Sequence, residues 1–359
     1  MRWPWKRKTS QDQLIVSWSG KTFAFVRARI NLDGLFEVRQ MGVERQGADS
    51  MDDFVRRLQA LGLKGYDACV MLRPEQYQLL QIDAPPVAPE ELRSAARYQI
   101  REMVDTHLDD LTLDVMRVGD GQQKGTPHLF VVTAATAVVR EVLDLGKSMD
   151  WPITVIDIQE TAQRNLQSVL ARRDGRLERA DAALVIADDR QAVLTISANE
   201  ELFYTRRLEL PEGFMGMQWS LDHAAVAGDT FMPVGEYVPD YNVGGVSYGN
   251  DYTATQAIHA GTTGAPAESD RAQRFLVEVQ RSLDLWDRSW SSMPLGGLRV
   301  FAGERSAELA GWLSREMGQS VSAMDMDTQF PGLQVAAAAD RALCLPLLGV
   351  LLRTESRKL

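Results

Sequence analysis

A three-strand pattern that occurs twice constrains the fold of this chain more than any other feature. The two copies run from Leu14 to Val38 and from Ala183 to Leu208, about 170 residues apart. Each consists of an apolar run, a short polar turn, a second β-rich run, another turn and a third run. Two such units so far apart predict a duplicated fold with two lobes. Because predicted strands alternate with predicted helices in both halves, we expect an α/β architecture with helices covering the sheets.

The composition excludes several classes of function. The chain has 359 residues, 45% of them hydrophobic, which is enough for two domains with full cores. Its net charge of −10 argues against a nucleic-acid binder, because phosphate contacts need a basic face. Cys69 and Cys344 lack the spacing of a metal or disulfide framework. No run approaches the ~20 apolar residues of a membrane helix, and no secretory signal is visible. We therefore expect a cytoplasmic protein without a metal site.

The remaining patterns predict how the chain is divided. Helices are expected at 55–63, 89–104, 138–149, 158–170, 271–288 and 306–317, with a mostly apolar closing segment at 335–352. Further strands are expected at 66–72, 77–82, 111–118, 129–133, 153–156 and 298–301. We predict a first-lobe core made of 13–75, 151–180 and 335–352, a small inserted subdomain at 76–150, and a second lobe at 181–334 with a mobile insertion at about 237–269.

The first 12 residues are predicted to form a flexible basic tail. It combines Trp3 and Trp5 with Arg2, Lys6, Arg7 and Lys8, a mixture that could touch the anionic surface of the inner membrane. The alternative is a disordered tail that binds nothing, since so few residues bury little area.

The first turn of each copy is the place where a two-lobed protein of this kind would hold phosphates. Such a turn needs glycine or small residues for close backbone approach and an acidic residue for a metal ion. The first turn reads Ser17-Trp18-Ser19-Gly20-Lys21-Thr22, and the second reads Ala187-Asp188-Asp189-Arg190. Ser19 to Thr22 could hold a phosphate with Asp188 or Asp189 on the metal ion, or they could form only a strand-to-strand turn. A Walker P-loop is excluded because a β-rich run follows.

Five segments, in this order along the chain, carry a resemblance to a known family: Tyr77–Asp105, Val131–Ile158, Leu202–Leu210, Phe275–Arg288 and Leu298–Glu304. They resemble the PilM family of type IV pilus assembly proteins, and within it the MshI proteins of mannose-sensitive haemagglutinin (MSHA) pilus biogenesis. The resemblance implies an actin-like (ribonuclease H-like) fold related to the cell-division protein FtsA, whose extra subdomain would be 76–150. It also implies a place on the cytoplasmic side of the inner membrane, peripheral to it.

The resemblance further implies a partner and a site for it. Members of the family bind the short cytoplasmic N-terminus of a bitopic PilN-like membrane protein. The groove for this peptide would lie between the main sheet of the first lobe and the extra subdomain, with Arg73, Tyr77 and Arg97 as lining candidates. Arg206 and Arg207, in the third run of the second copy, are expected to form a salt bridge or to serve the interface between the lobes.

The phosphate turns depart from the family pattern. Members that bind ATP have Asp-Ile-Gly-Ser-Ser-Ser in the first turn, so Ser17 stands where the aspartate would be and Ser19 where the glycine would be. The second turn lacks Asp-x-Gly, and the glycine-rich contact to adenine falls on Ala302, Gly303 and Glu304. Hydrolysis needs Mg²⁺ and a positioned water. We therefore predict a degenerate site with weak or absent ATP and Mg²⁺ binding and no ATPase activity.

These observations predict a non-enzymatic scaffold of a pilus assembly platform. One alternative is an active actin-like ATPase, which would need an acidic residue in each phosphate turn. The other is a relative of GspL, the cytoplasmic component of a type II secretion system, although that protein normally carries a membrane helix. The pilus assembly ATPase is a possible further partner, and self-association is possible; a nucleic-acid partner is not expected.

Overall fold

The computed structural model describes residues 12–119, 127–219 and 265–354, the first five residues of the last range as backbone only. The strands are β1 (Asp12–Ser19), β2 (Thr22–Ile30), β3 (Phe36–Arg45), β4 (Ala68–Leu72), β5 (Tyr77–Asp83), β6 (Leu111–Arg117), β7 (His128–Ala135), β8 (Ile153–Ile158), β9 (Ala180–Ile186), β10 (Gln191–Ala198), β11 (Glu201–Glu209), β12 (Leu295–Phe301) and β13 (Val321–Ala323). The α-helices are α1 (Met51–Ala60), α2 (Leu92–Gln99), α3 (Thr136–Ser148), α4 (Gln159–Arg173), α5 (Ala265–Ser289), α6 (Ser306–Met317) and α7 (Ala338–Leu351).

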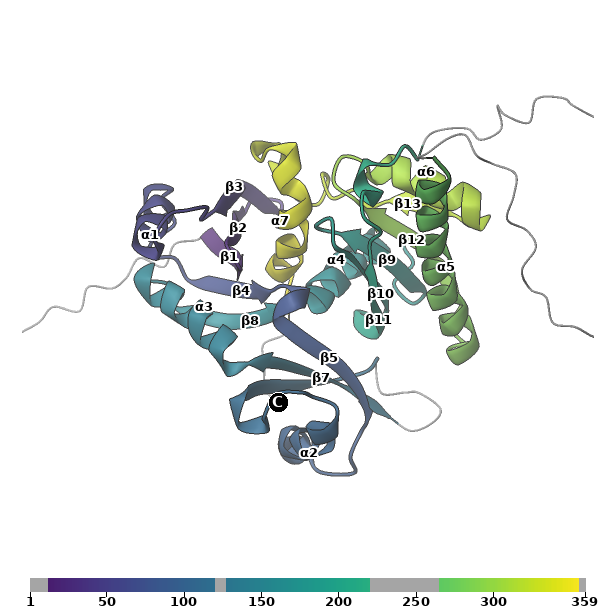
Figure 1. The fold of residues 1–359 in the computed structure, drawn as a ribbon, viewed down its shortest axis with the longest axis horizontal. Helices are drawn as coiled ribbons and strands as arrows, with labels where there is room; N and C mark the ends of the chain where they lie inside the picture. The colour runs from purple at the N-terminus through teal and green to yellow at the C-terminus, as the bar shows by residue number, and fades with distance from the viewer. Residues whose placement is uncertain (1–11, 120–126, 220–264, 355–359) are drawn as a thin grey trace, which may run out of the picture.

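The duplication predicted from the sequence is present as two five-stranded sheets of the same strand order. The first sheet runs β3-β2-β1-β4-β8 and the second runs β11-β10-β9-β12-β13. In each, the first three strands of the copy are antiparallel neighbours, and the remaining two join in parallel. Each sheet forms one lobe (Figure 1). The chain therefore has the expected two-lobed, actin-like α/β fold.

The strand β1 shows how the first sheet is buried on both faces. Its residues from Leu14 to Trp18 are all buried, as expected for a strand covered by helices on both sides. Leu14, Val16 and Trp18 contribute to the core beneath α1 and α3, whereas Ile15 belongs to the core beneath α7. Successive side chains of a strand point to opposite faces, so Ser17 and Trp18 face different surroundings.

Two crossing helices, α4 and α7, lie between the lobes (Figure 1). Helix α7 packs on β1, β2 and β3, while α4 follows β8 of the first sheet and packs on β9, β10 and β11 of the second. The two helices approach closely at Gly349, where an added Cβ would lie 2.0 Å from the carbonyl oxygen of Ala162. The Asn165 side chain also donates to the carbonyl of Gly349 (2.9 Å). This helix pair therefore joins the two lobes by close packing.

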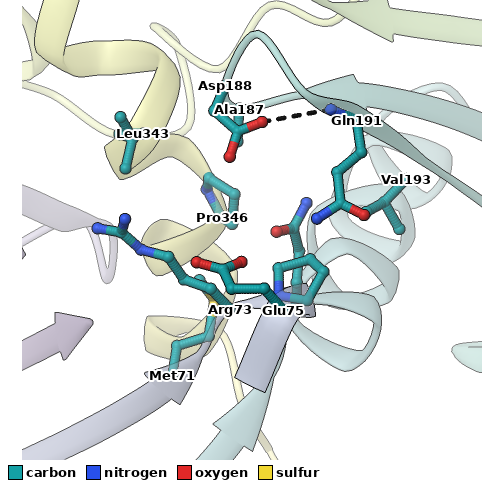
Figure 2. Close-up of a pocket in the computed structure, with 11 residues that line it drawn as sticks. Met71, Arg73, Glu75, Ala187, Asp188, Gln191, Val193, Leu343 and Pro346 are labelled. Atoms are coloured by element: carbon teal, nitrogen blue, oxygen red, sulfur yellow. Dashed lines mark hydrogen bonds between the residues drawn. The ribbon is translucent and has the colours of Figure 1, made fainter. Parts of the chain in front are cut away.

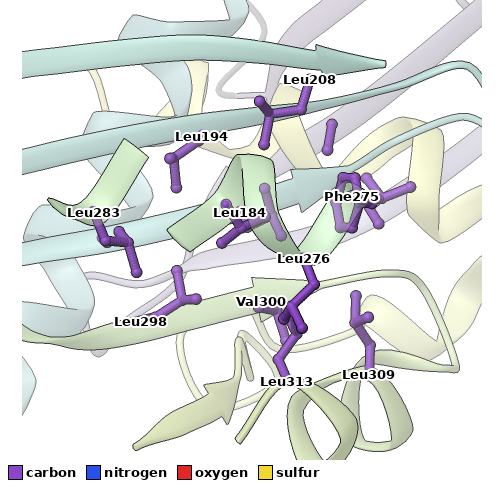
Figure 3. Close-up of a cluster of buried hydrophobic side chains, with 14 of the residues drawn as sticks. Leu184, Leu194, Leu208, Phe275, Leu276, Leu283, Leu298, Val300, Leu309 and Leu313 are labelled. Atoms are coloured by element: carbon purple, nitrogen blue, oxygen red, sulfur yellow. The ribbon is translucent and has the colours of Figure 1, made fainter. Parts of the chain in front are cut away.

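The core of the second lobe combines aliphatic and aromatic side chains. Figure 3 shows Leu184, Leu194 and Leu208 on the sheet facing Phe275, Leu276 and Leu283 of α5. Helix α6 adds Leu309 and Leu313 against Val300 of β12. The spacing of the apolar residues in α5 and α6 is the periodicity that predicts both helices. Helix α6 has the predicted bounds because Gly318, with φ +63°, adopts the left-handed conformation that ends a helix.

The inserted subdomain consists of a small sheet, β5-β7-β6, covered by α2. Its core contains Ile82, Ala96, Ile100, Val115 and Val131. The predicted helix over 89–104 is shorter in the structure: α2 is flanked by 3₁₀ turns at Pro89–Glu91 and Ile100–Glu102. The sheet ends at Ala135, and α3 then packs into the core of the first lobe rather than that of the subdomain.

The subdomain also touches the second lobe. The amide of Gly119 donates to the carbonyl of Leu202 (2.8 Å), and Val118 and Phe130 pack with Leu202. The predicted tail at 1–12 and the insertion at about 237–269 lie outside the described residues, except for Asp12, which begins β1, and 265–269, which begin α5. Across the described parts of the chain, the helices are too short or too polar to span a bilayer.

Candidate functional site

The turns of the two copies lie at the cleft between the lobes, and each is built from local contacts. The first connects β1 to β2, where Ser19 pairs with Thr22 and Gly20 takes a left-handed conformation (φ +58°) that favours glycine. In the second turn, the Asp188 side chain accepts hydrogen bonds from the backbone amides of Arg190 (2.9 Å) and Gln191 (3.3 Å). This is an Asx turn, so one Asp188 oxygen is already engaged by the turn itself.

Arg73, which follows β4, occupies the first-lobe side of the cleft. Its Nε donates to the hydroxyl of Ser17 (3.2 Å), and its Nη2 donates to the carbonyl of Thr22 (3.3 Å). Both Ser17 and Arg73 are buried. Burial lowers the pKa of the Arg73 guanidinium, while the charges of Glu75 and Asp188 oppose this effect; the group remains a cation. The position beside Ser17 is thus occupied by a cation of the protein itself, the guanidinium of Arg73.

Two carboxylates, one from each lobe, face the same space. Glu75 lies on the turn η1 (Pro74–Gln76) of the first lobe, and Asp188 lies on the second lobe; Figure 2 shows both pointing into the cleft beside Arg73. The Ser19 hydroxyl donates to Glu75 (2.6 Å), and Arg190 pairs with Glu75 (3.5 Å) and Asp188 (3.2 Å). The neighbouring Asp188 raises the pKa of Arg190. These contacts connect the two turns directly.

The cleft that remains is very small. The described side chains around it, including Met71, Val193, Leu343 and Pro346, leave a cavity of about 20 Å³ (Figure 2). This volume admits about one water molecule, whereas pockets for small molecules span ~300–1,000 Å³. A nucleotide does not fit into this cavity as it stands.

The other residues predicted for the ATP site do not converge on this cavity. The Lys21 ammonium donates to the carbonyl of Gly47 (3.1 Å) on the outside of the first lobe. Asp189 is exposed. Gly303 follows β12 with φ +60°, and an added Cβ there would lie 3.5 Å from Ala342 of α7. Asp188 thus lines the cavity, while Ser17 and Ser19 are connected to it through their bonds to Arg73 and Glu75. Lys21 and Asp189 lie at the surface.

A second set of inter-lobe contacts forms around Arg207 of β11. Its guanidinium pairs with Glu160 of α4 (3.0 Å) and donates to the carbonyls of Tyr77 (3.1 Å) and Pro74. It also lies 4.5 Å from the centre of the Tyr77 ring. The Tyr77 hydroxyl donates to Glu160, and burial, together with this carboxylate, raises the pKa of Tyr77 well above its usual value. The expected role of Arg207 at the lobe interface is confirmed.

The remaining arginines named from the sequence have separate structural roles. Arg206 pairs with Glu278 of α5 and donates to Ser282 (3.1 Å), all within the second lobe. Arg97 of α2 donates to the carbonyl of Leu111 (2.8 Å) and so ties α2 to β6. The predicted groove residues Arg73, Tyr77 and Arg97 therefore do not line one groove, because the first two are buried at the lobe interface and the third lies on the subdomain.

A more open groove lies between α1 and α3 on the first lobe, with a volume of about 460 Å³. Trp18, Val55 and Leu145 form its apolar floor, and Met51 stands exposed at its edge. The rim carries Arg140, Glu141 and Asp144 of α3. The indole Nε1 of Trp18 donates to Glu141 (2.9 Å). The sequence gives no direct signal for this groove, because its walls come from three separate segments.

The described residues contain no cluster of three or more His, Cys, Asp or Glu side chains placed to hold a metal ion. The two cysteines are free thiols. Asp188 and Glu75 are the carboxylates nearest to a metal position in the cleft, and both are paired with Arg190.

Among solved structures, this fold is similar to a PilM-PilN type IV pilus biogenesis complex, with a TM-score of 0.61 and 15% identity, covering 95% of this chain and 99% of that chain. A weaker similarity is to the cytoplasmic domain of EpsL, an inner-membrane component of the type II secretion system of Vibrio cholerae, with a TM-score of 0.40 and 14% identity over 61% of this chain and 79% of that chain. Another is to a Bacteroides thetaiotaomicron protein with an actin-like ATPase fold, with a TM-score of 0.45 and 9% identity over 90% of this chain and 95% of that chain.

These two weaker likenesses are too distant to argue from. No protein-family model matches the sequence, and no curated protein matches it either. At 15% identity the first similarity establishes the fold and nothing finer. The two-lobed, actin-like fold expected from the sequence is thus supported by an independent comparison over nearly the whole length of the chain.

Proposed function

We propose that this protein is a non-enzymatic scaffold on the cytoplasmic side of an inner-membrane platform that assembles a type IV pilus, of the MSHA kind suggested by the sequence. Its task would be to bind the cytoplasmic N-terminal segment of a PilN-like membrane protein. The observation that carries this proposal is the state of the cleft between the lobes. Arg73, Glu75, Asp188 and Arg190 fill and pair across the space in which a nucleotide would lie.

The charges of the cleft weigh against nucleotide binding. A phosphate placed between the turns would face the carboxylates of Glu75 and Asp188, and it would have to displace the Ser19–Glu75 hydrogen bond (2.6 Å). Catalysis of phosphoryl transfer consists almost entirely of positioning and electrostatic stabilisation. Arg190 is paired with Glu75 and Asp188, Arg73 is bonded to Ser17 and Thr22, and the cavity is near 20 Å³, so the cleft offers little of either.

The groove between α1 and α3 suits a short segment that is apolar and basic. Its floor is apolar, and its lining has the carboxylates Glu141 and Asp144 beside the cation Arg140, with Lys147 paired to Asp144 (2.7 Å). Cytoplasmic segments next to a membrane span carry an excess of Lys and Arg. The chain as a whole, with a net charge of −10, also attracts a basic partner.

Two other hollows, of about 650 and 630 Å³, lie on the subdomain, and both are bordered by Pro85. One is lined by Arg101 and Glu102, and the other by Arg117 without a carboxylate. Neither lining has the excess of carboxylates that the lining of the α1–α3 groove has, so we assign the PilN-like segment to that groove. The name of the similar PilM-PilN complex supports the class of partner, and the charges of this chain support the location.

Calorimetric titration tests the proposal with two ligands. We expect no heat with ATP and Mg²⁺, and we expect binding of a synthetic peptide of the first 20 or so residues of the PilN-like protein at micromolar Kd, about −8 kcal/mol. Met51→Arg should weaken peptide binding at least tenfold, because it places a cation at the edge of the groove. Met103→Arg on the subdomain, a methionine of similar exposure (49% against 42%), is the matched control and should bind as the wild type does.

The alternative of an active actin-like ATP-binding protein is favoured by one observation. The turn at Gly20 is open, with no atom within 4 Å of an added Cβ, and the exposed Lys21 ammonium would have to give up its bond to Gly47 to reach a ligand that approaches from solvent. ATP binding that is lost in both Lys21→Gln and Asp188→Asn would support this alternative and contradict the scaffold proposal. Failure of the peptide to bind would contradict the partner assignment.

A further inference from the structure

The proposed partner groove and the contacts between the lobes meet at one short turn, Arg73–Gln76, which we call the RPEQ turn. It connects β4 of the first lobe to β5 of the subdomain. Arg73, Glu75 and Gln76 bond to the end of β1, and Pro74 and Glu75 contact the second lobe. Two lines of contact therefore leave the turn, one towards the end of β1 and one towards the second lobe.

The first line runs from the RPEQ turn to the groove. Gln76 Nε2 donates to the carbonyl of Trp18 (2.8 Å), and its Oε1 accepts from the amide of Arg73 (2.9 Å). Ser17 and Ser19, the neighbours of Trp18, are bonded to Arg73 and Glu75. Because side chains alternate along a strand, these bonds fix the backbone of Trp18 from the cleft side while its indole forms the groove floor on the other side.

The second line runs from the same turn to the second lobe. The carbonyl of Pro74 accepts a hydrogen bond from Arg207, and the Glu75 carboxylate pairs with Arg190 (3.5 Å). Arg190 directly precedes β10, and Arg207 pairs with Val193 near the end of β11, so both lie at the open end of the β10–β11 hairpin. Any movement of the second lobe relative to the first therefore acts on the RPEQ turn. Arg207 is in addition held by the buried carboxylate of Glu160.

We propose that the RPEQ turn couples binding in the α1–α3 groove to closure of the two lobes. When the lobes are closed, their contacts fix the position of the RPEQ turn. The turn in turn fixes the backbone at Trp18 through hydrogen bonds, so the groove floor is preorganised for its occupant. The coupling is reciprocal: an occupant that needs this floor stabilises the closed lobes by the same free energy. The inference rests on the proposed function only for the identity of the occupant, a basic apolar peptide of the PilN-like partner.

The experiment breaks the contacts of the turn one at a time, first those to the second lobe and then the one to Trp18. Arg190→Gln and Glu75→Gln remove the exposed inter-lobe pair, and we expect each to weaken binding of the PilN-like peptide about threefold to fivefold. Gln76→Ala removes the bond to Trp18 and should weaken it about tenfold. Arg281→Gln, which breaks an exposed pair with Glu278 on α5, is the matched control and should leave the affinity unchanged.

Hydrogen–deuterium exchange separates this inference from the proposed function. In Arg190→Gln and Gln76→Ala, without peptide, the amides of Trp18–Thr22 should exchange at least threefold faster than in wild type and in Arg281→Gln. If the peptide binds but all variants keep the wild-type affinity, the coupling is overturned. If the peptide does not bind the wild type, the proposed function fails, and the exchange rates alone test the coupling. Unchanged rates at Trp18–Thr22 in the variants would then overturn it, and faster rates would support it.

Discussion

The two faces of the sheet at the end of β1 carry two cavities of opposite character. On the cleft side, Ser17 and Ser19 bond to Arg73 and Glu75, and about 20 Å³ of space remains. On the other side, the indole of Trp18 forms the floor of a groove of about 460 Å³ with an apolar base and an acidic rim. The cleft is polar and closed, while the groove is apolar and open.

The difference between the two cavities indicates which of them can still bind a ligand. A charged group that is paired within the protein has little left to offer to a ligand, because the ligand must first break that pair. The groove is not closed by such pairs, and the exposed Met51 side chain at its edge remains available for burial by a peptide. Neighbouring residues of one strand can therefore serve a structural contact on one face and a binding surface on the other.

The largest expected effect comes from removing the guanidinium of Arg207, which lies at the interface between the lobes. Arg207→Met leaves the carboxylate of Glu160, which is 1% exposed, without its cation. An uncompensated buried charge costs about 3–5 kcal/mol. We expect a fall of this size in the free energy of unfolding, measured by urea denaturation.

A double variant tests the cause of this fall. Arg207→Met combined with Glu160→Gln removes both charges, so it should recover a large part of the lost stability. A double variant as unstable as the sum of the two single variants would show that the ion pair is not what closes this part of the interface.

The second expected effect comes from the helix pair that joins the lobes beneath the cleft. In Gly349→Ala the new Cβ would lie 2.0 Å from the carbonyl oxygen of Ala162, so α7 must shift away from α4. We expect a loss of about 2–3 kcal/mol in the free energy of unfolding. Gly311→Ala in α6 is the matched control: its Cβ meets only the end of the Arg315 side chain at 3.5 Å, and alanine favours a helix by about 1 kcal/mol. Equal destabilisation of both variants would contradict close packing at the α4–α7 crossing.

The strands and most helices are predictable from the sequence because their apolar periodicity is local. The three runs of each copy became β1 to β3 and β9 to β11, and α6 has the predicted bounds. Two deviations have local causes. Helix α1 begins at Met51, four residues before the predicted start, since the Ser50 side chain accepts from the amide of Asp53 and caps it. Strand β13 has three residues, too few to show a period.

The polar contacts of the site are not predictable in this way. Gln163 and Gln167 of α4 look like a solvent-facing stripe, yet both are buried: Gln163 donates to the carbonyls of Ala183 and Val193 (2.9 Å each), and Gln167 to the carbonyl of Asp181 (2.7 Å). Likewise, nothing in the sequence pairs Glu75 with Arg190, because the two belong to different lobes. The only local signal was Pro74, which marks a turn after an apolar strand.

The third expected effect concerns an ion-pair cluster at the C-terminal end of α4. Unlike the closed cleft, this cluster is partly exposed to water. Hydrogen bonding to Arg299 lowers the pKa of Asp174 from 3.8 to about 2. A depressed carboxylate pKa contributes stability that is present above the unfolded-state value and is lost as the pH falls towards the folded-state value. We expect the stability of the wild type to fall more steeply between about pH 4 and pH 2 than that of Asp174→Asn. Parallel acid unfolding curves for the two proteins would contradict this role.

The smallest expected effect is that of Lys21, and it sharpens the contrast between the two faces most directly. Lys21 follows Gly20 in the first turn, which the sequence leaves open as a place for a phosphate, yet its ammonium donates to the carbonyl of Gly47 at an exposed site. A surface contact of this kind contributes little, so Lys21→Gln should change the free energy of unfolding by less than about 0.5 kcal/mol. It should also leave peptide binding in the α1–α3 groove unchanged, since Lys21 does not border that groove.

The measurement is a pair of urea denaturation curves with and without 1 mM or so of ATP and Mg²⁺, since a ligand that binds only the folded state raises its stability. Overlapping curves for wild type and variant under both conditions are expected from a turn that serves the strands alone. Stabilisation of the wild type by ATP that disappears in Lys21→Gln would mean that the closed cleft opens for a nucleotide, and the comparison on which the scaffold proposal stands would then fail.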